Sequence, residues 1–231
     1  MSTRPIRFAV VGYGHIGKRH AEMIARQPGA ELAAICDVRP IDLSDTIYPQ
    51  ARVFTDLNTL LNEVPDLDVV NVCTPNGLHT QMSTAAINAG KHVVCEKPMG
   101  LSKAACESVL YAALRHHRHV FGVMQNRYSP PSAWLKEVVE NKLLGDIHIV
   151  QVNCYWNRDE RYYKPGGWKG TQNLDGGTLF TQFSHWIDIM YWLFGDIKNI
   201  QAKFADFNHQ NSTAFEDSGF VSFDFVNGGM G

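Results

Sequence analysis

The sequence lacks the features that mark several large classes of protein. No apolar run approaches the ~20 residues of a membrane-spanning helix, and no apolar signal region precedes the first strand pattern. The formal net charge is only -2, so neither a nucleic acid nor a membrane surface is an expected partner. We find no internal repeat and no low-complexity segment. What remains is the composition of an ordinary globular protein, with 45% hydrophobic and 19% charged residues.

The cysteines are few and scattered. There are five, none in CxxC spacing, and Cys36, Cys73 and Cys95 end apolar strand patterns, where cysteine acts as a small buried hydrophobe. We therefore expect a reducing, cytoplasmic setting. The histidine-rich run 115–119 closes a predicted helix, where cations complement the helix dipole, so we expect no metal site.

The first half of the chain alternates strand and helix patterns. This order predicts an α/β fold, a doubly wound parallel sheet of the Rossmann type, over residues 1–125. The expected strands are 6–11, 31–36, 69–73, 92–95 and 120–124. The expected helices are 16–27, 57–63, 80–89 and 103–116.

After residue 125 the pattern changes. A helix over 132–140, a long alternating strand over 147–156, an apolar helix over 178–194 and strands over 197–207 and 219–226 predict an α+β domain at 126–231. The last residues, 227–231, contain Asn-Gly and Gly-Gly, which are typical of a hairpin turn. Because no further strand follows, we expect an incomplete antiparallel sheet whose last strand is an unpaired edge.

A glycine fingerprint follows the first strand. Gly12 permits a tight turn, Gly14 allows the backbone to approach a pyrophosphate, and Gly17 allows close packing of helix on strand. The next strand ends in Asp37, whose carboxylate can accept the ribose hydroxyls of NAD and repel the 2′-phosphate of NADP. The pattern predicts a dinucleotide site, with the pyrophosphate over the turn that includes His15 and Ile16. Arg39 leaves some room for NADP.

Two further strand ends carry polar residues. Thr74, Asn76 and His79 follow strand 69–73 and are placed to line the dinucleotide groove, although an ordinary turn explains each one as well. Glu96 and Lys97 follow strand 92–95, at the edge where open sheets bind their ligands. The residue before a proline is held extended, and the Lys97–Pro98 bond is a candidate for the cis form. Lys97 is our candidate general base, and a surface lysine paired with Glu96 is the alternative.

The helix over 178–194 carries a polar stripe on an otherwise apolar surface. Thr181, Gln182, His185 and Asp188 recur at helical spacing, which indicates that this face meets a cavity or a substrate. His185 can exchange protons near neutral pH, and Asp188 can orient it or bind a hydroxyl. A core histidine satisfied by Asp188 is the alternative interpretation.

Together these residues resemble the Gfo/Idh/MocA oxidoreductases. The resemblance rests on the glycine fingerprint, Asp37, residues 73–76, Glu96-Lys97-Pro98, and Asp175-Gly176-Gly177 followed by His185. It implies an NAD(P)-dependent dehydrogenase acting on a ring hydroxyl of a sugar, cyclitol or nucleotide-sugar. It also implies a second domain whose sheet mediates assembly into a homo-oligomer, a dimer or tetramer.

The resemblance also implies roles for individual residues. Lys97 and His185 match the family's acid–base residues, and NAD is the expected cofactor, with Glu96 among its contacts. Asn126, Trp168, Gln182 and Asp188 are the expected substrate-binding residues, beside Lys97 and His185. The segment 162–170, which includes Tyr162 and Lys169, is similar to one found in some UDP-sugar 3-dehydrogenases of the group.

Two departures from the family pattern stand out. Many members carry an aspartate four residues before the histidine, where this chain has Thr181. Relatives also continue with further strands, so the chain resembles a C-terminally truncated member. The same fold hosts NAD-dependent glycosidases and nucleotide-binding regulators without turnover, and both remain alternatives to a dehydrogenase.

Overall fold

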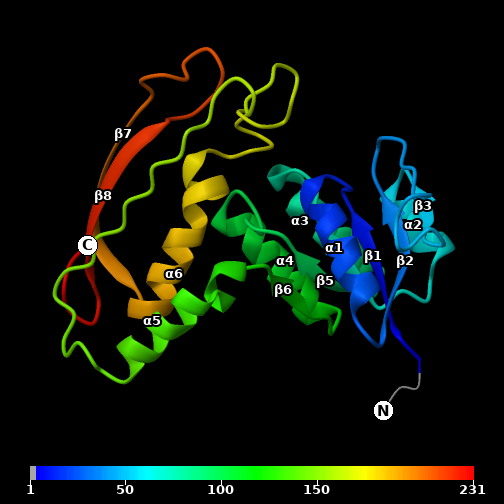
Figure 1. Ribbon diagram of the computed structural model, residues 1–231, viewed down its shortest axis with the longest axis horizontal. Coiled ribbons are helices and arrows are strands. Elements are labelled where there is room, and N and C mark those ends of the chain that lie inside the picture. Colours follow the sequence, from blue (N-terminus) through cyan, green and yellow to red (C-terminus); the bar gives the residue numbers. More distant parts are fainter. Residues whose placement is uncertain (1–3) are drawn as a thin grey trace. The chain divides into compact units, whose positions relative to one another are not determined.

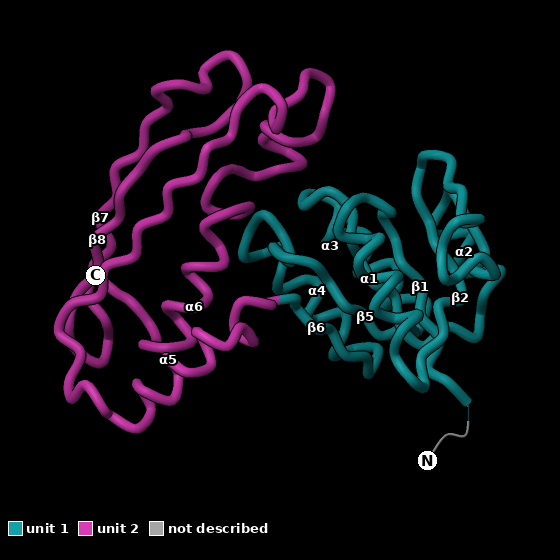
Figure 2. Tube along the Cα trace, viewed as in Figure 1, with its two compact units in different colours: residues 1–123 teal, residues 124–231 magenta. Residues whose placement is uncertain are grey.

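The computed structural model describes residues 4–231, which form two compact units (Figure 2). The first unit ends at Val123 and the second extends from Met124 to Gly231. Each unit has its own hydrophobic core, so the two are described separately. None of the helices in residues 4–231 combines the length and apolar character that crossing a membrane requires.

The first unit is built on a six-stranded sheet in which every pairing is parallel. Its strands lie in the order β3-β2-β1-β4-β5-β6 (Figure 1). This order confirms the predicted doubly wound fold. From β1 the chain first adds strands on one side of the sheet, β2 and β3, and then adds β4, β5 and β6 on the other side. The strands are β1 (Ile6–Val11), β2 (Ala30–Cys36), β3 (Arg52–Phe54), β4 (Val69–Val72), β5 (His92–Cys95) and β6 (Val120–Gly122).

Four helices cover the two faces of this sheet. They are α1 (His15–Arg26), α2 (Leu57–Glu63), α3 (His79–Asn88) and α4 (Lys103–Arg115). In β1, Ala9 and Val11 join a core shared with α2, α3 and α4, whereas Val10 joins a core shared with α1. Because both faces are buried, β1 reads as a continuous apolar run rather than an alternating one.

The short edge strand β3 was not predicted. Its three residues, Arg52 to Phe54, are too few to give a period of two, and only Phe54 is buried. The strand exists because it pairs with residues 34–36 of β2, which sequence alone does not reveal. The other strand and helix boundaries in this unit differ from the predictions by two residues at most, as is usual for element ends.

The second unit combines helices with a two-stranded antiparallel sheet. The turn η2 (Gln125–Tyr128) leads into α5 (Pro130–Glu140). A π-helical turn, η3 (Leu179–Phe183), continues into α6 (Ser184–Phe194), and β7 (Ile197–Ala205) pairs with β8 (Ser218–Phe225). Met190 of α6 packs with Phe223 and Phe225 of β8 to form the core. The predicted α+β class is thereby confirmed.

Two predictions for this unit are wrong. The expected strand over 147–156 is extended chain, in which only Ile149 makes a ladder bridge, to Met230. The alternation is genuine, because Val150 and Val152 pack against the core, but period two reports burial and not pairing. The prediction that the last strand, β8, is an unpaired edge is also wrong, because part of it forms hydrogen bonds with the residues that follow. Gly228 and Gly229 turn the chain back at positive φ, and Gly231 exchanges hydrogen bonds with Phe223.

Candidate functional site

The glycine turn after β1 is tightly enclosed on two sides and open on a third. Gly12 has φ +89°, and a Cβ there would lie 2.6 Å from the carbonyl carbon of Cys73. A Cβ on Gly17 would overlap the carbonyl oxygen of Gly12. Both neighbours are backbone atoms, which cannot move away easily. A Cβ on Gly14, in contrast, would meet nothing within 4 Å, so the backbone at Gly14 is open to a bound group.

Helix α1 begins immediately after Gly14. His15 and Ile16 form its first turn, whose N–H groups have no partner within the helix and carry the positive end of its dipole. Lys18 donates its backbone N–H to the Gly14 carbonyl at 3.0 Å, which closes the turn. The open side of the turn and the helix start therefore offer hydrogen-bond donors to an anion.

Asp37 follows β2 directly and is buried. Its carboxylate accepts the backbone N–H of Tyr13 at 2.7 Å, and the Arg39 side chain donates to both of its oxygens, at 2.9 and 3.0 Å. Burial alone would raise the pKa of Asp37, but the hydrogen bonds from Arg39 and Tyr13 outweigh it and lower the pKa. Asp37 is thus an ionised carboxylate at the strand end, as predicted, but Arg39 caps it.

A cavity of about 210 Å³ opens beside this pair. Tyr13, Lys18, Asp37 and Arg39 contribute to its lining, together with residues 40–42. Two cations, Lys18 and Arg39, and two carboxylates, Asp37 and Asp42, are therefore part of its lining. Such a cavity suits a ribose whose hydroxyls need an acceptor and whose neighbouring phosphates need donors.

The end of β4 contributes a second set of polar groups. The hydroxyl Oγ1 of Thr74 is buried and has no hydrogen-bond partner among the described residues. Asn76 is also buried, at 6% exposure. His79 is 1% exposed, with Nδ1 2.7 Å from the Pro98 carbonyl and Nε2 2.8 Å from the Thr74 carbonyl. His79 therefore ties the loops after β4 and β5 together, and both of its ring nitrogens are engaged by the protein.

The end of β5 carries Glu96 and Lys97. Glu96 Oε1 lies 3.0 Å from Nε2 of His20, and Asn71 donates its amide N–H to Nδ1 of the same ring. Because the amide nitrogen only donates, Nδ1 of His20 is the acceptor. Nε2 of His20 therefore carries the ring proton and donates a hydrogen bond to Glu96. Burial would raise the pKa of Glu96, but the hydrogen bond from His20 and the nearby Lys97 lower it.

Lys97 itself is half-buried, and its backbone N–H donates to Glu96 at 3.2 Å. The Lys97–Pro98 peptide is cis, which confirms that prediction. Glu96 is held chiefly by His20, a pairing that sequence reasoning missed because 76 residues separate the two.

The groups of the first unit fit a dinucleotide. Gly14 and the start of α1 would hold the pyrophosphate, Asp37 would accept a ribose hydroxyl, and the partnerless Thr74 hydroxyl would face the groove. This orphaned hydroxyl and the open backbone at Gly14 are the two structural observations that carry the fit. When bound, NAD supplies a hydride acceptor at this edge of the sheet.

In the second unit, the polar stripe of α6 is engaged by neighbouring residues. Arg127 of η2 donates to both carboxylate oxygens of Asp188, one at 2.8 Å and the other at 2.5 Å, and stacks over Trp192 at 5.7 Å. The Asp188 side chain is only 11% exposed. This ion pair fixes Asp188 in place, and Arg127 was missed because 61 residues separate the partners.

Thr181, which stands where many family members have an aspartate, is hydrogen-bonded to a nearby aspartate. Thr181 Oγ1 donates to the carboxylate of Asp175, which also accepts the Gly170 N–H at 2.8 Å. Asp175 is 1% exposed. A carboxyl group from the Asp-Gly-Gly segment thus lies next to position 181, where the side chain itself is a neutral threonine.

The remaining predicted substrate residues occupy varied positions. His185, on the first turn of α6, is half-buried, and Gln182, in η3, is buried at 7% exposure. Asn126 in η2 and Trp168 in the loop before η3 are both half-buried. A largely apolar cavity of about 460 Å³ follows α6 and is lined by Phe180, Ile187, Asp188 and their neighbours. The second unit therefore offers an apolar hollow with Asp188 at its wall.

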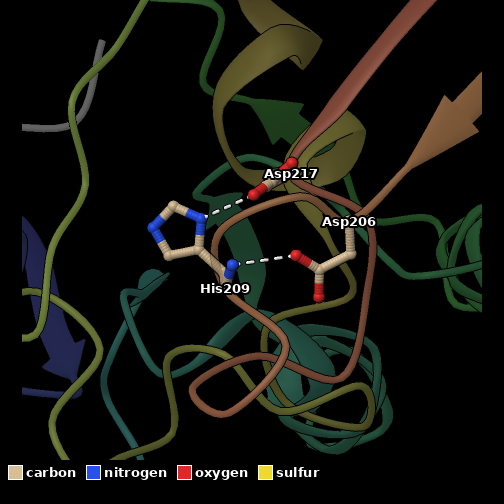
Figure 3. A group of neighbouring side chains, drawn as sticks. All are labelled: Asp206, His209 and Asp217. Atoms are coloured by element: carbon tan, nitrogen blue, oxygen red, sulfur yellow. Dashed lines mark hydrogen bonds and ion pairs between the residues drawn. The ribbon is translucent and has the colours of Figure 1, made fainter.

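One cluster, Asp206, His209 and Asp217, has donor atoms close enough to hold a metal (Figure 3). His209 Nδ1 donates to Asp217 at 2.9 Å, and its Nε2 donates to the Arg158 carbonyl at 2.5 Å. Asp217 also accepts the backbone N–H groups of Phe207 and Asn208. Both ring nitrogens of His209 donate hydrogen bonds to protein oxygens. We call this cluster the His209 clasp, because it links the β7–β8 loop to the backbone at Arg158.

This clasp should depend on pH. The hydrogen bond to Asp217 and the contact with the Arg158 carbonyl raise the pKa of His209. Its stabilisation is therefore complete below the ordinary histidine value of about 6.5 and is lost as pH rises through the raised pKa. We expect His209→Gln to weaken the loop by about 1–2 kcal/mol at pH 6 and by less at pH 9. Amide hydrogen exchange of residues 206–217 measures this, and an equal effect at both pH values would contradict it.

Comparison with protein families identifies the chain. Residues 6–123 match the oxidoreductase family with an NAD-binding Rossmann fold, and residues 133–231 match the GFO/IDH/MocA C-terminal domain. The chain belongs to the Gfo/Idh/MocA oxidoreductase family. The resemblance read from the sequence is thereby confirmed, as is NAD as the cofactor of its first domain.

Individual relatives are dehydrogenases of sugar-like alcohols. The chain is 28% identical to the D-glucoside 3-dehydrogenase of Escherichia coli, over 100% of this chain and 70% of the relative. It is 27% identical to an inositol 2-dehydrogenase of Salmonella paratyphi B, over 86% and 58%. The structure resembles the WlbA dehydrogenase of Chromobacterium violaceum, solved with NADH and UDP-GlcNAcA, at 35% identity and TM-score 0.92, over 100% of this chain and 67% of that one. The chain spans about two thirds or less of the length of most of these proteins.

Proposed function

We propose that the protein is an NAD-dependent dehydrogenase that oxidises a ring hydroxyl of a sugar-like substrate or reduces the matching ketone. One observation carries the proposal. Gly12 follows β1, Asp37 follows β2 and Lys97 follows β5, and the carboxyl ends of parallel strands lie at one edge of a sheet (Figure 1). A dinucleotide cradle and a half-buried lysine therefore share that edge.

Lys97 is the proposed general base. It would take the proton from the substrate hydroxyl as hydride leaves the same carbon, which removes the need for a protonated carbonyl product. Glu96, held by His20, would keep the loop that carries Lys97 in place. His79 supports the same loop through the Pro98 carbonyl. We assign Glu96 and His79 a positioning role rather than direct contact with the cofactor.

His185 is the proposed second acid–base group. Gln182, Asn126 and Trp168 are proposed to contact the substrate. Asp188, engaged by Arg127, would present a fixed carboxylate edge to a hydroxyl. These assignments extend the family pattern to this chain. They are supported by the burial of Gln182 and by the ion pair between Arg127 and Asp188.

The proposed substrate is a nucleotide-linked sugar. The support is the WlbA likeness, which covers the whole of this chain and whose partner ligand, UDP-GlcNAcA, combines a UDP group with a sugar carboxylate. The relatives that act on glucosides and inositols have lower identity. A UDP-sugar with a free ring hydroxyl is therefore the first class to test.

The test is NADH formation after the protein is mixed with NAD and separate pools of free sugars, cyclitols and UDP-sugars. NADH fluorescence in the UDP-sugar pool supports the proposal. Release of an aryl glycoside without net NADH would identify a glycosidase instead. Binding of NAD without any reaction in any pool would identify a non-catalytic regulator.

We further propose that the protein acts as a homo-oligomer in the cytoplasm. Ile200 and Phe220 of the two-stranded sheet are 58% and 65% exposed, which favours coverage of this surface by a second copy. All five cysteines are free, in keeping with a reducing compartment. Light scattering of the purified protein distinguishes a monomer from a dimer or tetramer.

A further inference from the structure

Two cations of the second unit lie against one aromatic ring. The guanidinium carbon of Arg158 is 4.0 Å from the centre of the Tyr162 ring, and Nζ of Lys169 is 3.8 Å from the same centre. Arg158 also stacks over Trp156 at 4.6 Å. Residues 158 and 169 thus converge on Tyr162 from two different parts of the loop that precedes η3.

Neither cation has an ion-pair partner among residues 4–231, although the nearby Asp175 partly offsets the lowering of the Lys169 pKa. No carboxylate in residues 4–231 forms an ion pair with Arg158 or Lys169, and Nε of Arg158 is buried without a hydrogen-bond partner there. The nearest buried acid, Asp175, directs its oxygens at Gly170 and Thr181. Burial first, and then the charge of Arg158, lower the pKa of Lys169. Two adjacent, partly desolvated positive charges cost free energy unless an anion compensates them.

The backbone around this pair is held firmly. The Arg158 carbonyl accepts the His209 ring N–H at 2.5 Å, and His209 is held in turn by Asp217 (Figure 3). Tyr163, next to Tyr162, is buried and packs edge-on against the His209 ring. These contacts fix the backbone at Arg158 and the position of Tyr163, next to the ring that both cations approach.

We propose that Arg158 and Lys169, supported by the Tyr162 ring, form a subsite for an anionic group of the substrate, a carboxylate or a phosphate. The inference rests on the proposed function and specifies its substrate class, because a neutral free sugar or cyclitol has no group that this pair would bind. Arginine supplies planar donors that match either oxyanion, and lysine adds a second charge. The pair selects charged sugars over neutral ones.

The test compares binding of four probes to the full chain loaded with NAD. UDP and UDP-glucose carry phosphates, glucuronate carries only a carboxylate, and UDP-glucuronate carries both. Arg158→Gln and Lys169→Gln remove one charge each, Arg158→Lys retains it, and Arg161→Gln is the matched control. Arg161 lies in the same loop but is 87% exposed and pairs with Asp159. Calorimetric titration gives each dissociation constant, and a thermal melt checks that each variant is folded.

We expect either glutamine variant to raise the dissociation constant of UDP-glucuronate roughly tenfold or more, as for loss of a charged hydrogen bond. Arg158→Lys should recover part of the loss, and Arg161→Gln should change it less than about twofold. A loss shared by UDP and UDP-glucose assigns the subsite to phosphate, and a loss confined to the two glucuronates assigns it to carboxylate. Either result supports the proposal.

Three outcomes would overturn the inference: unchanged affinity in both glutamine variants, an equal loss in the Arg161 control, or no measurable binding of any anionic probe. Failure of the dehydrogenase proposal is separate. It would show as charge-dependent binding without NADH formation. NADH formation from UDP-glucuronate with the same KM in both glutamine variants would instead retain the dehydrogenase and refute the subsite.

Discussion

Lys97→Ala is expected to lower the turnover number at least ~100-fold while the dissociation constant for NAD changes less than ~3-fold. The half-buried lysine follows β5 and is proposed to take the proton of the reacting hydroxyl, whereas the groups proposed to hold the dinucleotide come from β1, β2 and β4. Removing the base therefore removes the route for the proton and leaves the cofactor cradle unchanged. Rates of NADH formation and titration of NAD by fluorescence measure the two effects.

A matched control is available in Lys103→Ala. Lys103 lies six residues further along the chain, is 88% exposed and pairs with Glu107 on its own helix. It should leave both measurements unchanged. Undiminished turnover in Lys97→Ala would remove the lysine from the mechanism. A parallel loss of NAD affinity would instead make Lys97 a cofactor ligand.

The parts of this protein that sequence predicts well are those set by local geometry. Gly12 and Gly17 were identified because only glycine tolerates the backbone contacts that the turn imposes, and a Cβ at either position meets backbone in the structure. Asp37 was identified from its distance to the turn. These features depend on neighbours within one βαβ unit, so the sequence carries the whole signal.

The parts that sequence misses depend on distant partners. His20 and Glu96, or Arg127 and Asp188, pair across 76 and 61 residues, and nothing in either local sequence marks the partner. The extended segment 147–156 shows the same limit. Its alternation correctly reports that Val150 and Val152 are partly buried against the core, but whether it joins a sheet depends on what lies beside it. Pairing is a tertiary property, and period two does not encode it.

Arg39 is the most consequential of these unpredicted contacts. The sequence placed a cation two residues from Asp37, and the structure shows that its guanidinium holds both carboxylate oxygens. The carboxylate proposed to accept a ribose hydroxyl also restrains Arg39, a cation that could pair with a 2′-phosphate. Cofactor choice in this chain is therefore a balance between two neighbouring residues rather than the property of one.

Asp37→Ser should consequently shift the preference for NAD over NADP by roughly 100-fold or more. The change removes the acceptor for the ribose hydroxyls, removes the repulsion of a 2′-phosphate, and releases Arg39 to bind that phosphate. Dissociation constants for both dinucleotides, measured by fluorescence titration, give the ratio. Asp42→Ser is the control, because Asp42 lines the same cavity but its carboxylate accepts the backbone N–H of Ser44.

The double variant Asp37→Ser/Arg39→Ala isolates the contribution of the arginine. If release of Arg39 is what admits NADP, the double variant should bind both dinucleotides weakly, because it has neither the acceptor for NAD nor the cation for NADP. A double variant that still prefers NADP would show that repulsion by Asp37 alone excludes the phosphate. Equal loss of both dinucleotides in Asp37→Ser itself would mean that Asp37 matters chiefly through the Tyr13 N–H, which shapes the glycine turn.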